Sequence, residues 1–285
     1  MDQGHHSAVD ISFVILTWNS QSFIERCVLS YAAAMEKERL RAEFLIVENG
    51  SQDKTLDILE NTVRPRLPDF CRLEIIKLPG NAGTTKSRNL ALRKVAGRFC
   101  VVCDSDTEFL RGSWKDALRF LESDPQIGII AAHLFNEDKT TQQSVRRFPT
   151  LPDKLLKLRK TFLAMPESIT DHYDGFPWPS SREVDTAISA FWMFRSTLRK
   201  EVGLLDENIF YSPEDLDFCL RVWESGKKVM YYPHLEILHK MRRISHANPF
   251  SYIAISHLWG LLYYYKKHHY WISRKKLYKR LKKLT

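Results

Sequence analysis

The feature that most constrains the fold is an alternation in the first half of the chain between short apolar runs and stretches of helical character. The apolar runs are residues 11–16, 44–47, 73–78 and 99–103, and the helical stretches between them are residues 21–38, 55–63 and 85–95. Such alternation is typical of a mostly parallel sheet flanked by helices, which makes the predicted class α/β and Rossmann-like. Because the runs are almost entirely apolar, we expect both faces of the sheet to be buried.

Each predicted strand runs into short polar residues at its carboxyl end. In chain order these are Thr17, Asn19, Glu48, Asn49, Asn81, Asp104, Ser105 and Asp106. In open parallel sheets, ligands bind beyond the carboxyl ends of the strands. Each residue alone is also an ordinary turn or cap residue, but their presence after all four strands favours a binding site.

Asp104 and Asp106 predict a metal site. They lie two residues apart at the end of an extended run, so both carboxylates can face the same way. Two converging carboxylates repel each other unless a cation lies between them, and oxygen ligands suit Mg²⁺ or Mn²⁺. Such a metal takes its remaining ligands from substrate phosphates, so the pair indicates a nucleotide-diphosphate substrate.

The segment from Asn81 to Asn89 enters a helix by way of Gly83. A helix start offers backbone N–H groups to an anion, and Arg88 adds a positive charge that could pair with a phosphate or a base. Neither the P-loop spacing nor a GxGxxG fingerprint is present, which removes the main support for kinase-like and dinucleotide-binding functions.

The distribution of charge and the cysteine content further narrow the class of protein. Residues 266–285 hold nine Lys or Arg and no acid, and the rest of the chain is balanced at 34 basic and 34 acidic residues. The five cysteines lie in apolar stretches, and Cys100 and Cys103 should point to opposite faces of a strand, as buried thiols of a reduced protein. No apolar run is long enough to span a membrane, and we expect a cytoplasmic protein.

The second half contains a helix that begins with acidic residues. Glu214, Asp215 and Asp217 follow Pro213, before apolar residues spaced for one helix face. Acids in a first turn stabilise the helix dipole, which is the structural alternative to a catalytic role. A direct displacement on a sugar requires a base for the incoming hydroxyl, and a carboxylate can supply it.

Several segments, in this order, carry a resemblance to a known family. They are residues 14–19 (VILTWN), 47–53 (VENGSQD), 81–83 with Arg88 and Asn89, 104–106 (DSD), and 202–207 (VGLLDE) leading to 214–217 (EDLD) and Arg221. The chain is similar to the family 2 glycosyltransferases with the GT-A fold, most of all to a bacterial rhamnosyltransferase-like subgroup. It departs from the family pattern at Glu48, where Asp is usual, and at Ala190, where Gly is frequent.

The resemblance implies a metal-dependent inverting glycosyltransferase of cell-surface polysaccharide synthesis. The donor would be a nucleotide-diphosphate sugar, dTDP-rhamnose or a UDP-hexose, and the acceptor a hydroxyl of a glycan or lipid-linked oligosaccharide. The implied donor-binding residues are Arg88 and the polar residues after the four strands, except Asp106, which is implied as a metal ligand only. Asp215 is the implied general base, Glu214 and Asp217 the acceptor-binding acids, and His239 a third metal ligand beside Asp104 and Asp106. Trp192 is placed to stack on an acceptor sugar, although such aromatic residues are more often part of the core.

The resemblance and the charge distribution divide the chain into three parts. Residues 1–110 form the predicted nucleotide-sugar half, residues 111–245 the acceptor and base half, and residues 246–285 a helical tail. Residues 266–285 combine basic and apolar residues as an amphipathic helix does, which predicts contact with an anionic membrane at its inner face. The alternatives are a tail helix packed on the body, a nucleotidyltransferase with a similar metal cleft, and a basic-tailed nucleic-acid-binding protein. The last leaves the strand-end residues unexplained, so we expect no nucleic-acid partner.

Overall fold

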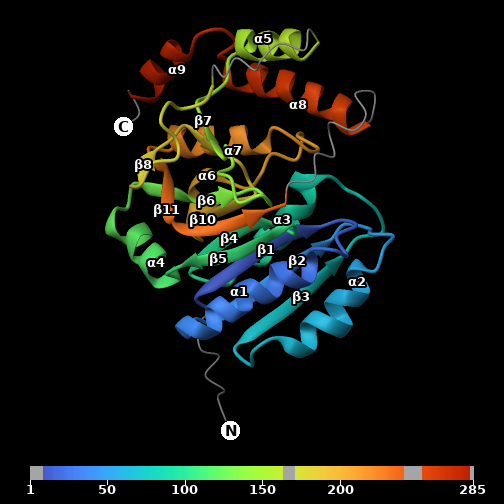
Figure 1. The fold of residues 1–285 in the computed structure, drawn as a ribbon. Coiled ribbons are helices and arrows are strands. Elements are labelled where there is room, and N and C mark those ends of the chain that lie inside the picture. Colours follow the sequence, from blue (N-terminus) through green and yellow to red (C-terminus); the bar gives the residue numbers. More distant parts are fainter. Residues whose placement is uncertain (1–8, 163–170, 241–251, 283–285) are drawn as a thin grey trace.

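A computed structural model describes residues 9–162, 171–240 and 252–282. Its main sheet has the strand order β3-β2-β1-β4-β10-β6-β11-β5, with β8 paired to β11 (Figure 1). The strands are β1 (Ile11–Thr17), β2 (Ala42–Glu48), β3 (Cys71–Lys77), β4 (Phe99–Asp104), β5 (Thr107–Gly112), β6 (Ile127–Phe135), β8 (Arg182–Glu183), β10 (Phe191–Arg195) and β11 (Lys228–His239). A second, two-stranded sheet pairs β7 (Val145–Arg146) with β9 (Thr186–Ala187). The predicted α/β class is confirmed.

The sheet joins the two predicted halves of the chain. Strands β1 to β4 pair in parallel, as predicted from the first half. Strand β10 then lies antiparallel between β4 and β6, and β11 runs parallel to β6. The four predicted strands agree with β1 to β4 within two residues at each end, and the longer strand β11 ends at His239.

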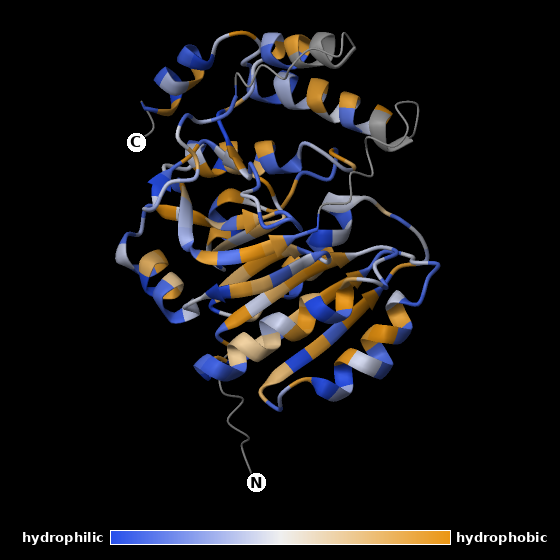
Figure 2. Ribbon diagram, in the orientation of Figure 1, coloured by the Kyte–Doolittle hydropathy of each residue, from blue (hydrophilic) through white to orange (hydrophobic). Residues whose placement is uncertain are grey.

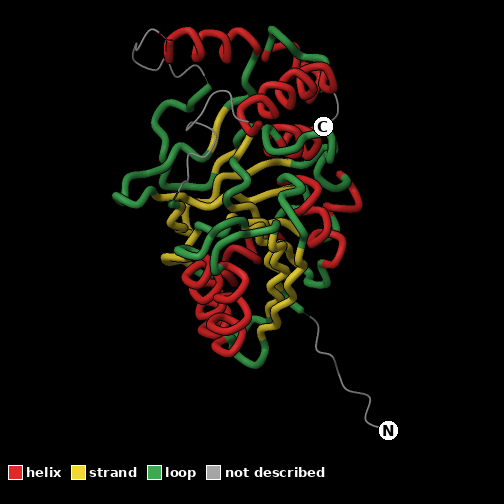
Figure 3. Tube along the Cα trace, turned by 90° about the vertical axis from the view of Figure 1, so that its right-hand side faces the viewer, coloured by secondary structure: helices red, strands yellow, loops and turns green. Residues whose placement is uncertain are grey.

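Helices cover both faces of the sheet and gather at one end of the molecule (Figures 1 and 3). They are α1 (Ile24–Glu38), α2 (Thr55–Ile58), α3 (Thr84–Lys94), α4 (Trp114–Ser123), α5 (Leu151–Phe162), α6 (Leu198–Val202), α7 (Glu214–Glu224), α8 (Tyr252–His268) and α9 (Arg274–Leu281). A π-helical turn, Leu59–Val63, continues α2. The segment 135–176, which has little regular sequence pattern, includes β7 and α5, and its residues 163–170 lie outside the described part.

The alternating side chains of the parallel strands build one core on each face of the sheet. Phe13 packs with Tyr31 of α1 and Trp114 of α4 on one face. Val14 belongs to the second core, which includes Leu92 of α3 and residues of α7. Cys103 and Cys100 belong to the first and second core respectively, and both are buried free thiols, as the sequence predicted. Apolar residues therefore fill both sides of the strands, and Figure 2 shows that the central strands consist mostly of hydrophobic residues.

A third apolar cluster attaches the C-terminal helices to α7. Leu216 and Leu220 of α7 pack with Tyr264 of α8 and with Leu277 and Leu281 of α9. Leu277 is 1% exposed and Leu281 5% exposed, so the apolar side of α9 is covered by the protein itself. Leu277 and Leu281 are therefore not available for the membrane contact predicted for residues 266–285, because α7 and α8 already bury them. Within the described residues, no helix combines the length and hydrophobicity needed to cross a bilayer.

Candidate active site

The carboxyl ends of the parallel strands border a cavity of about 330 Å³. This volume is within the range of small-molecule sites, roughly 300–1,000 Å³. The predicted site residues that line it are Asn49, Asn81, Arg88, Asp104, Ser105, Asp106, Glu214, Asp215 and His239. They come from both halves of the chain, because β11 and α7 contribute to the same cavity as the loops after β1 to β4.

Asp104, Asp106 and His239 form a cluster with the composition of a divalent metal site. One ligand atom from each residue lies within 4.8 Å of the others. His239 Nε2 is 3.5 Å from Asp106 Oδ1 and 3.8 Å from Asp104 Oδ2. Two carboxylates and one imidazole are a donor set that suits Mn²⁺ or Mg²⁺. The structure thus brings together the three predicted metal ligands, from β4, from the turn after it and from the end of β11.

A buried glutamine orients the imidazole of His239. Gln142 Oε1 lies 2.8 Å from His239 Nδ1, and Gln142 Nε2 donates to Asn136 Oδ1 at 3.1 Å. Since the glutamine oxygen can only accept, His239 Nδ1 carries the proton and donates it. The lone pair is then on Nε2, the atom that faces Asp104 and Asp106. Outer hydrogen bonds of this type fix the tautomer and orientation of metal-binding histidines.

Arg88 connects the acidic cluster with the acids of α7. It is 1% exposed, and its guanidinium pairs with Asp104 and donates to Ser189 Oγ at 2.8 Å. The same group is 3.5 Å from Glu214 Oε1, and Ser189 Oγ donates to that oxygen at 2.8 Å. A buried arginine between carboxylates keeps charges that would otherwise repel each other at fixed positions. Arg88 thus lines the cavity as predicted, but it is held by protein carboxylates.

Glu214 and Asp215 begin α7 at the wall of the cavity. Burial and the neighbouring Asp215 charge raise the pKa of Glu214 to about 8, against the opposing effects of Arg88 and Ser189. Burial also raises the pKa of Asp215, whose Oδ1 accepts the Leu216 N–H at 2.8 Å. The two adjacent acids therefore carry less than two full negative charges near neutral pH. A carboxylate of raised pKa is a stronger base than the same group in water.

Gly83 allows the start of α3 to approach the loop before α7. Its φ is +87°, and a Cβ there would lie 2.5 Å from the carbonyl oxygen of Phe210. The Thr84 N–H donates to that same oxygen at 2.6 Å. The Thr84 N–H, one of the amides predicted to bind an anion, thus bonds within the protein. It does so because the loop before α7 folds over the start of α3.

The other strand-end residues shape the loops around the cavity. Asn49 Oδ1 accepts the Ala82 N–H and the Ser87 hydroxyl, both at 2.9 Å, and its Nδ2 donates to Asn81 Oδ1 at 3.0 Å. Glu48 is buried and accepts the Ser51 N–H at 2.6 Å, and Asn19 Oδ1 accepts the Gln52 N–H at 2.8 Å. Thr17 is fully buried. Thr17, Asn19 and Glu48 are not among the residues that line the cavity.

Two predicted acceptor-binding residues are structural. Trp192 is fully buried, stacks on Phe218 with ring centroids 5.4 Å apart, and donates from Nε1 to the Ala187 carbonyl at 3.0 Å. Asp217 is also fully buried and lies one turn along α7, away from the cavity residues Glu214 and Asp215. Neither side chain can contact an acceptor, because β10 and α7 turn both of them into the interior.

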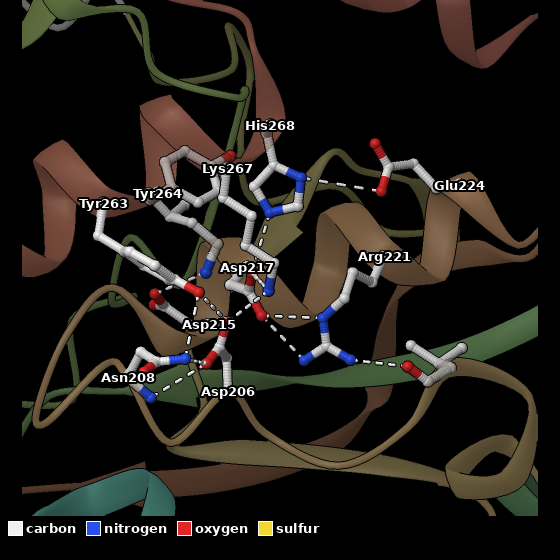
Figure 4. Close-up of polar contacts among 12 residues, drawn as sticks. Asp206, Asn208, Asp215, Asp217, Arg221, Glu224, Tyr263, Tyr264, Lys267 and His268 are labelled. Carbon is white, nitrogen blue, oxygen red and sulfur yellow. Dashed lines mark hydrogen bonds and ion pairs between the residues drawn. The ribbon is translucent and has the colours of Figure 1, made fainter.

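Asp217 is the centre of an ionic network that joins α7 to α8 (Figure 4). Its carboxylate accepts from Lys267 Nζ at 2.6 Å, from His268 Nε2 at 2.9 Å and from Arg221 Nε at 2.9 Å. Burial alone would raise the pKa of Asp217, but the His268 hydrogen bond and the charges of Arg221 and Lys267 lower it well below its usual range. Lys267 also pairs with Asp206 at 2.7 Å.

The cavity includes residues that the sequence did not suggest. They are Leu16, Trp18, Ser20, Thr84, Ile188, Ser189, Phe210, Tyr211, Ser212 and His257, and they lie beside Gly83 and Ala190, which the sequence had singled out. Trp18 adjoins the predicted Asn19, and Ser189 adjoins Ala190, so closer reading of those two segments would have found them. His257 had no sequence signal, because only the packing of α8 against the start of α7 brings it to the cavity.

Comparison with known proteins identifies the family. The sequence profile described as glycosyl transferase family 2 matches residues 12–201. The chain belongs to glycosyl transferase family 2. The matched residues include β2 to β4 and the acidic pair Asp104 and Asp106.

Two curated relatives come from Mycobacterium tuberculosis. An N-acetylglucosaminyl-diphospho-decaprenol L-rhamnosyltransferase is 23% identical over 279 residues, covering 90% of this chain and 85% of the relative. A pre-mycofactocin glycosyltransferase is 26% identical over 172 residues, covering 60% of this chain and 33% of the relative. The first similarity extends over almost the whole chain and includes its second half.

Solved structures share the fold at low sequence identity. GalNAc-T7 with UDP, GalNAc and Mn²⁺ has a TM-score of 0.61 at 15% identity, covering 91% of this chain and 48% of that one. Residues 1–349 of S. aureus TarS in complex with UDP-GlcNAc have a TM-score of 0.53 at 20% identity, covering 84% and 62%. The mannosyltransferase PcManGT from Pyrobaculum calidifontis with GDP-Man and Mn²⁺ has a TM-score of 0.54 at 14% identity, covering 84% and 59%. The chain thus spans less than two thirds of each of these three solved chains, and the likeness identifies the fold as GT-A.

Proposed function

We propose that this glycosyltransferase uses a divalent metal and transfers a sugar, with inversion, from a nucleotide-diphosphate donor to an acceptor hydroxyl. One observation carries the proposal: a single cavity holds the Asp104, Asp106 and His239 cluster together with the acids that begin α7. A displacement at a sugar carbon needs positive charge on the leaving-group side and a base on the acceptor side.

The proposed reaction is a single displacement. The acceptor oxygen forms a bond to the anomeric carbon while the bond from that carbon to the diphosphate oxygen breaks. The hydroxyl proton passes to the carboxylate of Asp215, and the nucleoside diphosphate leaves with the electron pair of the broken bond. Attack from the side opposite the leaving group inverts the configuration at the anomeric carbon.

Each part of the cavity has a role in this reaction. Asp104, Asp106 and the Nε2 atom of His239 would hold Mn²⁺ or Mg²⁺, which supplies charge neutralisation for the departing diphosphate. Arg88 fixes Asp104 and adds a positive charge on the same side of the cavity. Asn49 and Asn81 hold the loops after β2 and β3 at the donor end. Glu214, tied to Ser189, positions the start of α7 and with it Asp215.

The rhamnosyltransferase relative suggests which donor and acceptor to test first. Its name pairs a rhamnosyl group with an acceptor on a decaprenyl diphosphate, and its similarity extends over 90% of this chain. We therefore propose dTDP-rhamnose as donor and a lipid-linked saccharide at the inner face of the cell membrane as acceptor. UDP-hexoses are the second choice, because TarS was solved with UDP-GlcNAc.

A thermal-shift panel of nucleotide sugars, each with and without Mn²⁺, tests the donor. A ligand that binds the folded state raises the melting temperature by mass action. We expect dTDP-rhamnose with Mn²⁺ to raise it, and Asp106→Asn to remove the Mn²⁺-dependent part. Asp106→Asn is preferable to a change at Asp104, because loss of Asp104 would leave buried Arg88 without its closest partner. No shift with any sugar nucleotide in the presence of Mn²⁺ would contradict the proposal.

Product analysis separates glycosyl transfer from nucleotidyl transfer. A glycosyltransferase releases a nucleoside diphosphate, whereas a nucleotidyltransferase consumes a nucleoside triphosphate and releases pyrophosphate. Family membership favours the first reaction. Release of pyrophosphate from a triphosphate and a sugar phosphate would identify the second.

A further inference from the structure

Exposed apolar side chains are concentrated at one end of the molecule. Among the described residues, eight large apolar side chains are exposed, and Leu110 of β5 is the only one of them outside α5, α8 and the turn after α8. The other seven are Leu155, Leu156, Ile255, Leu258, Trp259, Trp271 and Ile272, here called the outer apolar patch. The Leu151 N–H donates to the Trp271 carbonyl at 2.8 Å and joins α5 to that turn. Figures 1 and 2 show these helices together, with apolar residues along α8.

Helix α8 has two apolar faces with different surroundings. Its inner face, which includes Gly260, Leu261, Tyr264 and His268, is buried against α7 and α9. Its outer face carries Ile255, Leu258 and Trp259, which are 46%, 59% and 67% exposed. These three residues have the spacing of one helical stripe, and exposed Lys266 continues the same stripe two turns later. A helix that needed only its packing on the body would not require leucine, isoleucine and tryptophan on the opposite side.

The charge around the outer apolar patch is positive. Residues 240–285 contain twelve Lys or Arg and no Asp or Glu. Lys266, Lys275, Lys276, Lys279 and Lys282 are exposed on α8 and α9 or at the end of α9. Asp153 of α5 is paired with Arg274 at 2.8 Å. Apolar side chains with tryptophan, flanked by exposed lysines, match the surface of a bilayer that contains anionic lipids.

The same helix forms part of the cavity wall. His257, beside the exposed Leu258, lines the cavity together with Glu214 and Asp215. Gly260 packs so closely on the start of α7 that a Cβ there would lie 2.3 Å from the Ser212 carbonyl oxygen. One helix therefore has one side at the acids of α7 and the other side at the outer apolar patch.

We propose that the outer apolar patch docks on an anionic lipid bilayer and thereby brings a lipid-linked acceptor to the cavity. The acceptor part of this proposal rests on the proposed function. The apolar contact comes from α5, α8 and the turn after α8, and the lysines of α9 add the attraction to lipid head groups. This differs from the sequence expectation for residues 266–285, because Leu277 and Leu281 are buried inside the protein.

Vesicle binding by the full chain tests the docking surface. Phosphatidylcholine vesicles with and without phosphatidylglycerol are sedimented with wild type, with the double variant L258S/W259S and with L110S as the control. Leu110 is exposed to a similar extent as Ile255 but lies away from the patch. We expect binding that requires phosphatidylglycerol and weakens with salt. The double variant should bind at least about tenfold more weakly, and L110S should bind like wild type.

Tryptophan quenching provides a second measurement. Phospholipids with brominated acyl chains should quench the fluorescence of wild type. Trp259→Phe should still bind vesicles but lose part of that quenching, because phenylalanine keeps the apolar contact without the fluorophore. Quenching equal to that of wild type would overturn the placement of α8 at the bilayer.

Donor binding in the same samples separates this proposal from the proposed function. If dTDP-rhamnose binds with Mn²⁺ in wild type but vesicles do not, the docking surface is wrong and the enzyme assignment stands. If vesicles bind and no sugar nucleotide does, the docking surface stands and the enzyme assignment is wrong. A dimer that L258S/W259S converts to monomer, without vesicle binding, would assign the patch to a second copy of the chain and overturn the proposal.

Discussion

At the scale of single residues, the candidate site depends on buried charged side chains that hold one another in fixed positions. Arg88 contacts Asp104 on one side and Ser189 and Glu214 on the other, so it fixes the spacing between the acidic cluster and α7. Removal of one partner of such a buried group costs several kcal/mol, because it leaves a charge uncompensated. Tests of single residues are therefore cleanest at positions outside this chain of contacts.

Asp215→Asn should abolish transfer and preserve donor binding. The amide has nearly the same shape as the carboxylate but cannot take a proton, and loss of a general base lowers kcat by about 10²–10⁴-fold. Calorimetry with the donor and Mn²⁺ should give an affinity close to that of wild type. Asp174→Asn serves as the control, since its side chain is fully exposed. A kcat unchanged in Asp215→Asn would exclude Asp215 as the base.

Gln142→Ala should weaken metal binding without removing a ligand. His239 would lose the hydrogen bond that keeps its Nε2 lone pair toward Asp104 and Asp106. Loss of such an outer partner costs about 10–100-fold in metal affinity. Mn²⁺ titration followed by calorimetry measures the change, with Gln143→Ala as the neighbouring control. Equal Mn²⁺ affinity in both variants would contradict the assigned role of Gln142.

The sequence predicted Asp104 and Asp106 at the cavity, but it also predicted Thr17, Asn19 and Glu48, which do not line it. Asp104 and Asp106 come directly after an apolar run, and the carboxyl end of a parallel strand has a known position. Tryptophan and aspartate often bind sugars and acceptors, which is why Trp192 and Asp217 were predicted. Their orientation, however, depends on β10 and on the contact of α7 with α8. Local sequence carries no information on such long-range contacts.

At the scale of elements, the contact between α7 and α8 sets the position of the proposed base. Gly260→Ala would place a Cβ 2.3 Å from the Ser212 carbonyl oxygen, so α8 or the start of α7 must move. Overpacking of this kind costs about 1–3 kcal/mol. We expect a lower melting temperature and a lower kcat, measured by thermal unfolding and steady-state kinetics.

Gly80→Ala is the matched control for Gly260→Ala. A Cβ at Gly80 would meet no atom within 4 Å, so the same change of residue adds no clash there. Equal melting temperatures and equal kcat values in the two variants would contradict the role of the close contact.

The stripe of leucines in α9 shows why element packing was mispredicted. Basic residues on one side and leucines on the other fit a membrane surface and a protein surface equally well. Leu216 and Leu220 of α7 and the tyrosines of α8 bury Leu277 and Leu281. The two leucines of α7 lie far earlier in the chain, so the sequence near α9 does not reveal them. Amphipathicity identified the helix, and only the fold identified what covers it.

At the scale of the whole molecule, pH should act on the attachment of the C-terminal helices. Burial alone would lower the pKa of His268, but hydrogen bonds to Asp217 and Glu224 raise it overall. The stabilisation from charged His268 is complete below its unfolded pKa of about 6.5 and is lost as pH rises through the raised folded value. The contribution of Asp217, whose pKa is lowered, is complete above about pH 4 and is lost on acidification.

The network should therefore stabilise the protein most between about pH 4 and 6.5. His268→Gln should lower the free energy of unfolding by about 1–3 kcal/mol in that range and should flatten its decline at higher pH. Chemical denaturation across pH measures both effects. His269→Gln is the control, because His269 is exposed. A pH dependence unchanged in His268→Gln would mean that other groups control it.

Strand β10 makes the two halves inseparable. It covers the side of β4 from Phe99 to Cys103 and comes from residues 191–195, far along the chain. A fragment ending at residue 110 would expose that edge as a row of unpaired peptide groups, which invites aggregation. Donor preference could be exchanged between relatives by swapping their first 110 residues. We expect such a swap to succeed only when β10 is transplanted together with those residues.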